Sequence, residues 1–346
     1  MRIHMGKMQK AVAVLSPGRV EIVEIPMPTV HDYECLVKMR ASGFCNSTDL
    51  KTIDNEIGDG KIPFPIILGH ESVGEVVETA SKVRNIRVGD VFLNPHGRLE
   101  PGVPYSRYWG GMMEYAIVQD RKVMDEMGVD KSHYFGFPRQ IPGSIPFEDG
   151  GVILTLREIY SAVWNFGFQP GMEVLVYGDG PGGLGFVTFM KRAGAAWVGC
   201  VGRHDDRLKR IRDTGRADLT VNERTGDVAA AVGDRKLDLI IDAVGSVDII
   251  RENSRRLKPG GRIGCYGVIK KQHSELSLVE LRNNTVLHLL NYPNEKPTTH
   301  DEIVGMIERG EIHPKDFYSH VLPMEEIARA VELIRSREAF KVILKV

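Results

Sequence analysis

The amino-acid sequence predicts a two-domain α/β protein, with one β-rich domain and one doubly wound parallel sheet. Two observations predict this class. Between Lys10 and Gly150, short runs of strand-forming residues recur between glycines and prolines, as is typical of an all-β domain of barrel or sandwich type. From Gly171 onward, apolar runs of strand length alternate with helical patterns, which is the signature of βαβ units. A chain of 346 residues can bury two separate cores.

Six runs in the first part of the chain have the apolar, β-branched character of strands. They are AVAVL (11–15), VEIVEI (20–25), CLVKM (35–39), SVGEVVE (72–78), GDVFLN (89–94) and MEYAIV (113–118). Two amphipathic helices and a closing strand are expected after residue 300. They are DEIVGMIERG (301–310), MEEIARAVELIRSRE (324–338) and FKVILKV (340–346).

The middle of the chain alternates between strands and helices. The expected strands are MEVLVYGDG (172–180), WVGCVG (197–202), LDLIIDAVG (237–245), GRIGCYGV (261–268) and TVLHLL (285–290). The expected helices are LGFVTFMKRAGA (184–195), DRLKRIRDTG (206–215) and IIRENSRRLKPGG (249–261). We therefore predict a parallel-sheet domain over residues 166–299, with residues 1–165 and 300–346 forming the β-rich domain.

Composition limits the classes of partner. The net charge of −1 gives no sign of a nucleic-acid or anionic-membrane surface, and no apolar run reaches the length of a membrane helix. We expect a small-molecule partner. Four scattered cysteines without a CxxC pair favour neither a disulfide framework nor a thiolate-rich structural metal site, and fit a soluble protein of the reducing cytoplasm.

A glycine-rich turn follows the strand that ends at Tyr177. It reads GDGPGG, and its residues are Gly178, Gly180, Pro181, Gly182 and Gly183. In a strand–turn–helix context, such glycines permit a tight turn, a close approach of a pyrophosphate to the backbone, and close packing of helix and strand. The sequence therefore predicts a dinucleotide site at this turn.

The end of the second strand of such a site chooses between NAD and NADP, because an acid there binds the ribose 2′-hydroxyl and repels a 2′-phosphate. This chain has glycine there, followed by an arginine and a histidine, so we expect NADP(H) to be favoured over NAD(H). The alternative is that Asp205 or Asp206 turns toward the ribose. The expected residues of this end of the site are Gly202, Arg203, His204 and Arg207.

The segments GFCNSTD and ILGHES contain a candidate metal site made of Cys45, His70 and Glu71. A thiolate, an imidazole and a carboxylate together suit zinc, and three protein ligands with one open position are typical of a catalytic zinc. Taken singly, Cys45 could equally be a small buried residue and His70 a turn residue.

The chain resembles the zinc-dependent medium-chain alcohol and polyol dehydrogenases, which combine a GroES-like β-barrel catalytic domain with a Rossmann domain. The resemblance covers nearly the whole chain. It rests on GFCNSTD, PIILGHESVGEVVE, VGDVF, GGMMEYAIV, PGMEVLVYGDGPGGLG, LDLIIDAVG, LKPGGRIGCYG and FKVILKV, which occur in the order of the family.

The resemblance implies one catalytic zinc held by Cys45 and His70, with Glu71 as a constant or alternating ligand. It places Ser47 at the hydroxyl that relays the substrate proton, with Thr48 as a second candidate, and Asp49 behind the ligands as an orienting carboxylate. A homodimer or homotetramer is also implied, formed by extension of the parallel sheet at TVLHLL.

Two departures from the family matter. The segment FLNPHGRLEPGVPYSRYWGG contains no cysteine, so we expect no structural zinc. Leu154 stands where many relatives have a further zinc ligand; water could complete the coordination, and Glu158 is a weaker substitute. The same segment offers a polar and aromatic wall for the substrate, or else exposed loop residues without a special role: His96, Arg98, Tyr105, Arg107, Tyr108 and Trp109.

The resulting hypothesis is an enzyme that transfers a hydride between NAD(P) and a hydroxyl or ketone of an alcohol, polyol, sugar or cyclitol. Zinc would polarise the substrate oxygen, and Ser47 or Thr48 would pass the proton onward. The nearest alternative is a zinc-free NADPH-dependent quinone or enone reductase of the same superfamily, which Leu154 favours. The alternative of another class is a non-catalytic dinucleotide-binding sensor.

Overall fold

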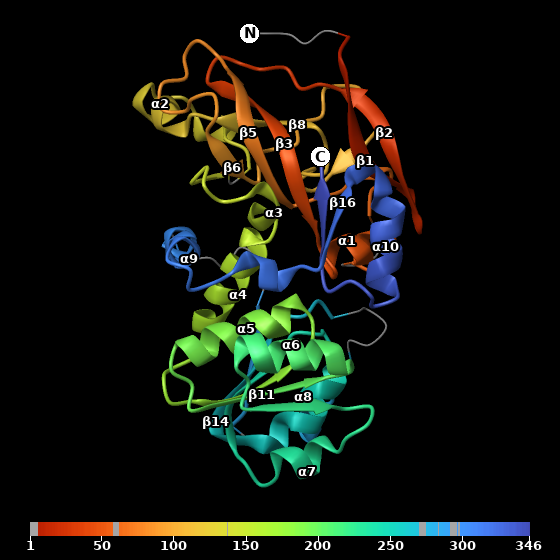
Figure 1. Cartoon of the computed structure of the whole chain (residues 1–346), viewed down its shortest axis with the longest axis vertical. Coiled ribbons are helices and arrows are strands. Elements are labelled where there is room, and N and C mark those ends of the chain that lie inside the picture. The colour runs from red at the N-terminus through yellow and green to blue at the C-terminus, as the bar shows by residue number, and fades with distance from the viewer. Residues whose placement is uncertain are drawn as a thin grey trace. The chain divides into compact units, whose positions relative to one another are not determined.

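The computed structural model describes residues 6–57, 62–136, 138–269, 275–282, 284–290, 296 and 298–346. These residues form two compact units. Unit 1 contains the described residues up to Glu56, those from Ile62 to Leu154 and those from Val304 onward, and unit 2 contains Ile57 and Thr155–Ile303. Two of the boundaries between the units fall within helices, α4 (Ile153–Asn165) and α9 (Thr299–Glu308) (Figure 1). The predicted domain limits at 165 and 300 stay a prediction.

Unit 1 is built on two sheets of mostly short strands. One sheet has the order β2 (Arg19–Pro26), β1 (Met8–Ser16), β4 (Ile66–Ile67), β7 (Ser106–Arg107). The other has the order β16 (His320–Pro323), β17 (Val342–Lys345), β3 (Glu34–Phe44), β5 (Glu71–Thr79), β6 (Val91–Leu93), β9 (Arg139–Ile141), with β8 (Tyr115–Gln119) paired to β3. The inward faces of β3, β5 and β8 supply a buried apolar cluster that includes Val37, Val76 and Val118.

Strand β3 is the element that positions the site in unit 1. It pairs antiparallel with β5, which puts Gly43 opposite Glu71, and with β17, which puts Phe44 opposite Val342. Residues far apart in the chain are therefore neighbours where β3 ends. The helices of unit 1 are short except for α10, and they are α1 (Thr48–Ile53), α2 (Arg121–Glu126), α3 (Phe147–Gly150) and α10 (Ile327–Arg335).

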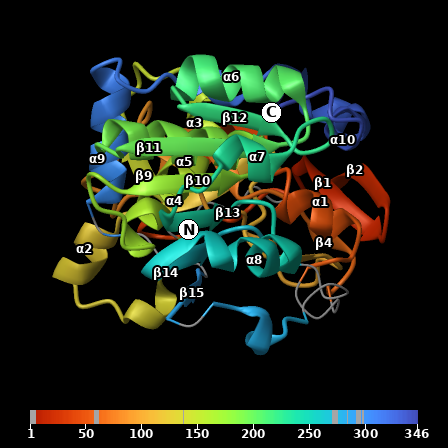
Figure 2. The same cartoon turned by 90° about the horizontal axis from the view of Figure 1, so that it is seen from below.

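In its described residues, unit 2 contains a six-stranded parallel sheet. Its order is β12 (Leu219–Asn222), β11 (Trp197–Gly202), β10 (Glu173–Tyr177), β13 (Leu237–Asp242), β14 (Leu257–Cys265), β15 (Val286–Leu289), as Figure 2 also shows. Helices cover both faces, with α5 and α6 on one side of the strands and α7 and α8 on the other (Figure 1). Their bounds are α5 (Pro181–Arg192), α6 (Asp205–Gly215), α7 (Val228–Val232) and α8 (Val247–Asn253).

The predicted fold class, a β-rich domain together with a doubly wound parallel sheet, is confirmed by this architecture. One predicted helix was too long. The helical expectation over 249–261 is met only as far as Asn253, followed by a short 3₁₀ turn, and β14 already begins at Leu257. Leu257 already pairs with Leu237 of β13, so pairing in the sheet ends the helix earlier than its polar pattern suggests. Among the described residues, no helix combines the length and apolar character that crossing a membrane requires.

Candidate functional site

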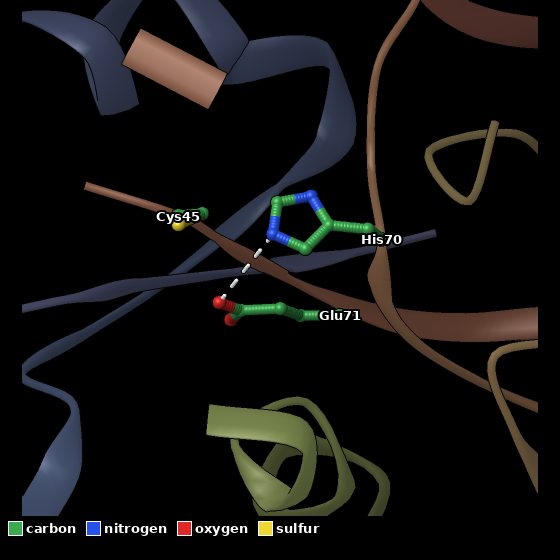
Figure 3. A group of neighbouring side chains, drawn as sticks. All are labelled: Cys45, His70 and Glu71. Carbon is green, nitrogen blue, oxygen red and sulfur yellow. Dashed lines mark ion pairs between the residues drawn. The ribbon is translucent and has the colours of Figure 1, made fainter. Parts of the chain in front are cut away.

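The strand pairings of unit 1 bring Cys45, His70 and Glu71 together. Cys45 directly follows β3, Glu71 begins β5, and His70 directly precedes it. One ligand atom of each residue, the cysteine sulfur, an imidazole nitrogen and a carboxylate oxygen, lies within 4.8 Å of the other two. Figure 3 shows the His70 ring directed toward the Glu71 carboxylate, with Nε2 and Oε1 separated by 3.9 Å. We call these three residues the metal-ligand group.

Asp49 lies behind the metal-ligand group and contacts two of its members. Its Oδ1 is 3.4 Å from His70 Nδ1, and its Oδ2 accepts a hydrogen bond of 2.9 Å from the backbone N–H of Cys45. Asp49 is only 2% exposed, so its carboxylate is held rigidly. A carboxylate on one ring nitrogen leaves the other for a metal, which is the usual arrangement behind a histidine ligand.

Glu71 divides its two oxygens between two neighbours. Oε1 faces His70, whereas Oε2 forms an ion pair with Nζ of Lys341, which precedes β17. Both side chains are almost fully buried, Glu71 at 4% and Lys341 at 3% exposed. Gly43 makes room for the pair, because a Cβ there would lie 2.5 Å from Glu71 Oε2 and 3.1 Å from Lys341 Cε.

Charge in this region favours a cation. Burial alone would lower the pKa of His70, but the Asp49 carboxylate and the Cys45 sulfur raise that pKa well above its ordinary value. The Cys45 sulfur also accepts a 3.3 Å hydrogen bond from the backbone N–H of Thr48. Electron-rich sulfur, nitrogen and oxygen donors converging on one point fit Zn²⁺ in both number and kind.

The metal-ligand group contains three donors among the described residues, and Leu154 supplies no fourth, because its hydrocarbon side chain has no donor atom. Ser47 and Thr48 both lie half-buried at the start of α1. Ser47 makes no side-chain hydrogen bond to cap this helix, so its hydroxyl is not used there.

Of the aromatic residues expected around the substrate, Trp109 lies beside the metal-ligand group. Its ring centroid is 5.4 Å from that of His70, and the ring centroid of Tyr108 is 5.8 Å from that of Trp109. Both side chains are exposed. The other residues of this loop make contacts of their own. Arg98 binds Glu34, Arg107 contacts His96 Nε2 at 2.7 Å, and Tyr105 packs against the core of the four-stranded sheet.

In unit 2, the glycine-rich turn connects β10 to α5 as predicted from the sequence. Gly178 has a φ of 125°, a conformation that favours glycine, and Gly180 caps a helix that begins at Pro181 and Gly182. A Cβ on Gly183 would collide with the carbonyl of Gly178, so the third glycine is required for strand and helix to pack. The first backbone N–H groups of α5 are those that bind a pyrophosphate in such folds.

Asp179, inside this turn, reaches the end of β11. Its Oδ2 accepts hydrogen bonds from the backbone N–H groups of Arg203 (2.6 Å) and His204 (2.9 Å), and lies 2.9 Å from His204 Nδ1. Burial opposes the charge, but these donors hold the pKa of Asp179 below its ordinary value. A Cβ added to Gly202, the last residue of β11, would lie 2.7 Å from Oδ2 of this carboxylate.

The remaining cofactor candidates differ in accessibility. Arg203 is 58% exposed and forms an ion pair with Glu223, whereas Arg207 is buried within α6. Arg203 also lines a hollow of about 540 Å³ beside β12, α7 and α8. Three arginines and three carboxylates line this hollow, so it carries no charge bias: Arg203, Arg224, Arg256, Glu223, Asp227 and Glu252.

Two residues of these sites were missed in the sequence. Lys341 was seen only as part of a closing strand, and the pairing of β17 with β3 that brings it to Glu71 has no local sequence signal. Asp179 is the second residue of the recognised motif GDGPGG. An acid in that turn, together with glycine at the end of the next strand, is the signal that could have identified it.

Comparison with known proteins gives two family models and many relatives. Residues 31–127 match the alcohol dehydrogenase GroES-like domain, and residues 216–344 match the zinc-binding dehydrogenase model. The sorbitol dehydrogenase of Ovis aries is 26% identical over 353 residues, which cover 97% of this chain and 96% of that protein.

Two solved structures illustrate the likeness of fold. A zinc-binding dehydrogenase of Sinorhizobium meliloti 1021 bound to NADP superposes with a TM-score of 0.77 at 24% identity, covering 98% of this chain and 100% of that one. An alcohol dehydrogenase of Escherichia coli CFT073 complexed with NADH gives 0.79 at 22% identity, covering 99% and 100%. The motif order, the two folded units and the family models agree, and the chain belongs to the zinc-dependent medium-chain dehydrogenase/reductase superfamily, a family of NAD(P)-dependent oxidoreductases.

Proposed function

We propose that this protein is a zinc-dependent dehydrogenase that transfers a hydride between NADP(H) and the carbinol or ketone carbon of an alcohol or polyol. The observation that carries the proposal is the convergence of Cys45, His70 and Glu71 within 4.8 Å, with Asp49 orienting the histidine. The similarity of the whole chain to sorbitol dehydrogenases supports the polyol class.

Cys45, His70 and Glu71 would hold the zinc, and the position left open by Leu154 would receive the substrate or water. When bound, zinc supplies Lewis acidity toward the substrate oxygen. Residues of the chain orient the ligands and move the proton. Asp49 fixes the His70 ring, and Ser47, whose hydroxyl is not used as a helix cap, accepts and passes on the substrate proton, with Thr48 as the second candidate.

NADP(H) is favoured because the end of β11 carries Gly202 in place of an acid and is followed by Arg203 and His204. A 2′-phosphate would draw the exposed Arg203 guanidinium away from Glu223, since a dianion attracts it more strongly than a single carboxylate. Relatives of this fold bind either dinucleotide, NADP in one structure and NADH in another, so the preference depends on local residues.

The substrate is proposed to be a polyol, a sugar or a cyclitol. Trp109 and Tyr108 form an exposed aromatic wall beside His70. The face of an aromatic ring packs against the C–H groups of a hydroxylated chain or ring, while the hydroxyl groups of that substrate remain free to form hydrogen bonds.

The compartment is proposed to be the reducing cytoplasm. The four cysteines are unpaired, which fits such a compartment.

The direct test of this function is Cys45→Ala, with Cys35→Ala as the matched control. Cys35 is a buried cysteine of the same unit and lies outside the metal-ligand group. We expect Cys45→Ala to lose zinc and turnover of secondary alcohols and polyols while retaining dinucleotide binding, and Cys35→Ala to retain all three. Zinc is measured by atomic absorption, turnover by NADPH absorbance, and binding by calorimetry.

The same experiment separates the alternatives. Turnover of quinones or enones by a protein without zinc would identify the zinc-free reductase. Firm dinucleotide binding without turnover of any alcohol or carbonyl, with or without added zinc, would identify the non-catalytic sensor. Either outcome would overturn the proposed function.

A further inference from the structure

A carboxylate occupies the end of β11 although the residue at that end is glycine. A Cβ on Gly202 would lie 2.5 Å from Cβ of Asp179 and 2.7 Å from its Oδ2. The side chain of Asp179 therefore fills the space into which a side chain at position 202 would project. The end of β11 has no acidic residue of its own, and the carboxylate found there belongs to Asp179 of the glycine-rich turn.

This carboxylate is turned toward the protein rather than toward solvent. Asp179 is 9% exposed, and its Oδ2 receives the two backbone N–H groups of Arg203 and His204 together with His204 Nδ1. With these donors around one oxygen, that oxygen has little capacity left for a ribose hydroxyl. The contacts instead clamp the residues that follow β11.

The clamp fixes the orientation of the His204 imidazole. A carboxylate only accepts hydrogen bonds, so Nδ1 of His204 carries a proton, and Nε2 is the ring nitrogen that remains for another partner. The His204 side chain keeps 23% of its surface exposed, so a ligand can reach it. With a proton on each ring nitrogen, the imidazole can donate to Asp179 on one side and to a second anion on the other.

We propose that Asp179 is a positioning residue that sets the dinucleotide preference, by holding the His204 ring so that Nε2 donates a hydrogen bond to the phosphate on the adenosine ribose of NADP(H). This inference rests on the proposed function, because it needs a dinucleotide at the glycine-rich turn. A ribose 2′-hydroxyl carries no charge, so NAD(H) gains much less from the same ring.

Asp179→Asn tests the proposal. The amide oxygen can still accept the two backbone N–H groups, but the negative charge beside His204 is lost. We expect the dissociation constant for NADPH to rise about tenfold and that for NADH to change by less than about threefold, as the loss of one charge-assisted hydrogen bond implies. Both constants are measured by calorimetry on the full-length protein. An unchanged ratio, or tighter NADPH binding because a repelling carboxylate was removed, would overturn the proposal.

Three further variants make the result specific. Asp213→Asn removes an exposed charge from α6, the helix that His204 caps, and is expected to leave the ratio of the two constants unchanged. His204→Asn is expected to show the loss of NADPH affinity seen in Asp179→Asn, and the double variant should lose no more than either single variant, because the two residues act as one unit. If Asp179→Asn fails to fold, His204→Asn decides, and an unchanged ratio in that variant contradicts the proposal.

Failure of this inference is distinguishable from failure of the proposed function. A wild-type protein that binds neither dinucleotide would overturn the proposed function. A wild-type protein that binds NADPH and turns over alcohols, but whose preference is unchanged in Asp179→Asn and His204→Asn, would overturn only the role of Asp179.

Discussion

Lys341 balances the negative charge of the metal-ligand group. Burial favours the neutral amine, yet the carboxylate of Glu71 and the sulfur of Cys45 raise the pKa of Lys341 above its ordinary value. Since one Glu71 oxygen pairs with this ammonium and the other faces His70, Glu71 is placed between a fixed protein cation and the position proposed for zinc. The Lys341 ammonium and a bound zinc would share this one buried carboxylate, so each cation changes how strongly Glu71 interacts with the other.

Lys341→Met tests this balance. The substitution leaves Glu71 buried without its ammonium partner, so we expect the free energy of unfolding of the zinc-free protein to fall by about 3–5 kcal/mol. Zinc should restore part of this loss, because it supplies the missing positive charge, and the increase in Tm on zinc addition should exceed that of wild type. Denaturant unfolding and thermal melts with and without zinc measure both effects.

Lys345→Met is the matched control, because Lys345 belongs to the same end of the chain but its ion pair with Glu148 is 60% exposed on the lysine side. A change of no more than about 1 kcal/mol is expected there, with zinc stabilisation as in wild type. If Lys341→Met behaved like this control, the charge-balancing role would be wrong.

The sequence predicted the three candidate ligands, which the structure brings together, but not the residues that support their charges. Cys45, His70 and Glu71 belong to recognisable motifs, and their residue types suit zinc. Lys341 lies far from them in the chain and meets Glu71 only through the register of β17 on β3, which depends on tertiary packing. Asp179 is local to a recognised motif, but the direction of its side chain depends on the absence of a Cβ at Gly202.

At the scale of elements, the loop that lacks cysteines is held by a buried ion pair. Arg98 binds both oxygens of Glu34 at 2.7 and 2.6 Å, donates to the carbonyl of Thr29 at 2.9 Å, and lies over the Phe135 ring at 4.8 Å. A bidentate arginine–carboxylate pair of this kind fixes geometry as well as charge. Arg98, expected from the sequence near a substrate wall, therefore has a structural role in this loop.

Arg98→Ala should loosen the loop. We expect a loss of about 3 kcal/mol in the free energy of unfolding, because Glu34 is 5% exposed and would be left buried without a cation. Chymotrypsin should cleave the folded variant faster at Tyr105, Tyr108 or Trp109 than wild type, since cleavage requires local opening. Arg19→Ala removes an exposed ion pair with Glu21 and should change neither quantity measurably. Equal protease resistance of Arg98→Ala and wild type would contradict the role.

Element boundaries were predicted well where periodicity and turn residues agree. The strand and helix on either side of GDGPGG were predicted because glycines, an apolar strand and a helical pattern indicate the same structure. The helix before β14 was predicted too long, because its polar residues are compatible with a helix as far as Lys258, and only packing against β13 extends the strand back to Leu257.

At the scale of the whole molecule, the sequence predicted the fold class because its two halves have different periodicities, and each half folds into the architecture typical of its pattern. What composition and pattern do not determine is assembly, since the same surface residues serve a monomer or an oligomer. In the described part of the parallel sheet, β15 is an edge strand and keeps two apolar side chains on the surface, Val286 at 43% and Leu289 at 58% exposed.

An apolar edge strand of this kind is an aggregation hazard unless a partner covers it, and two copies related by a two-fold axis can pair their β15 strands to continue the sheet. We therefore expect a dimer, or a tetramer of such dimers. The double variant Val286→Lys, Leu289→Lys is expected to sediment as a smaller species, because lysines on an edge strand oppose strand pairing.

The control is Val321→Lys, on the edge strand β16 of the other large sheet. It should leave the mass unchanged, because its 40% exposed side chain lies outside the proposed interface. Sedimentation velocity at micromolar concentration measures all three proteins, and a monomeric wild type, or a lysine variant with the mass of wild type, would contradict pairing through β15.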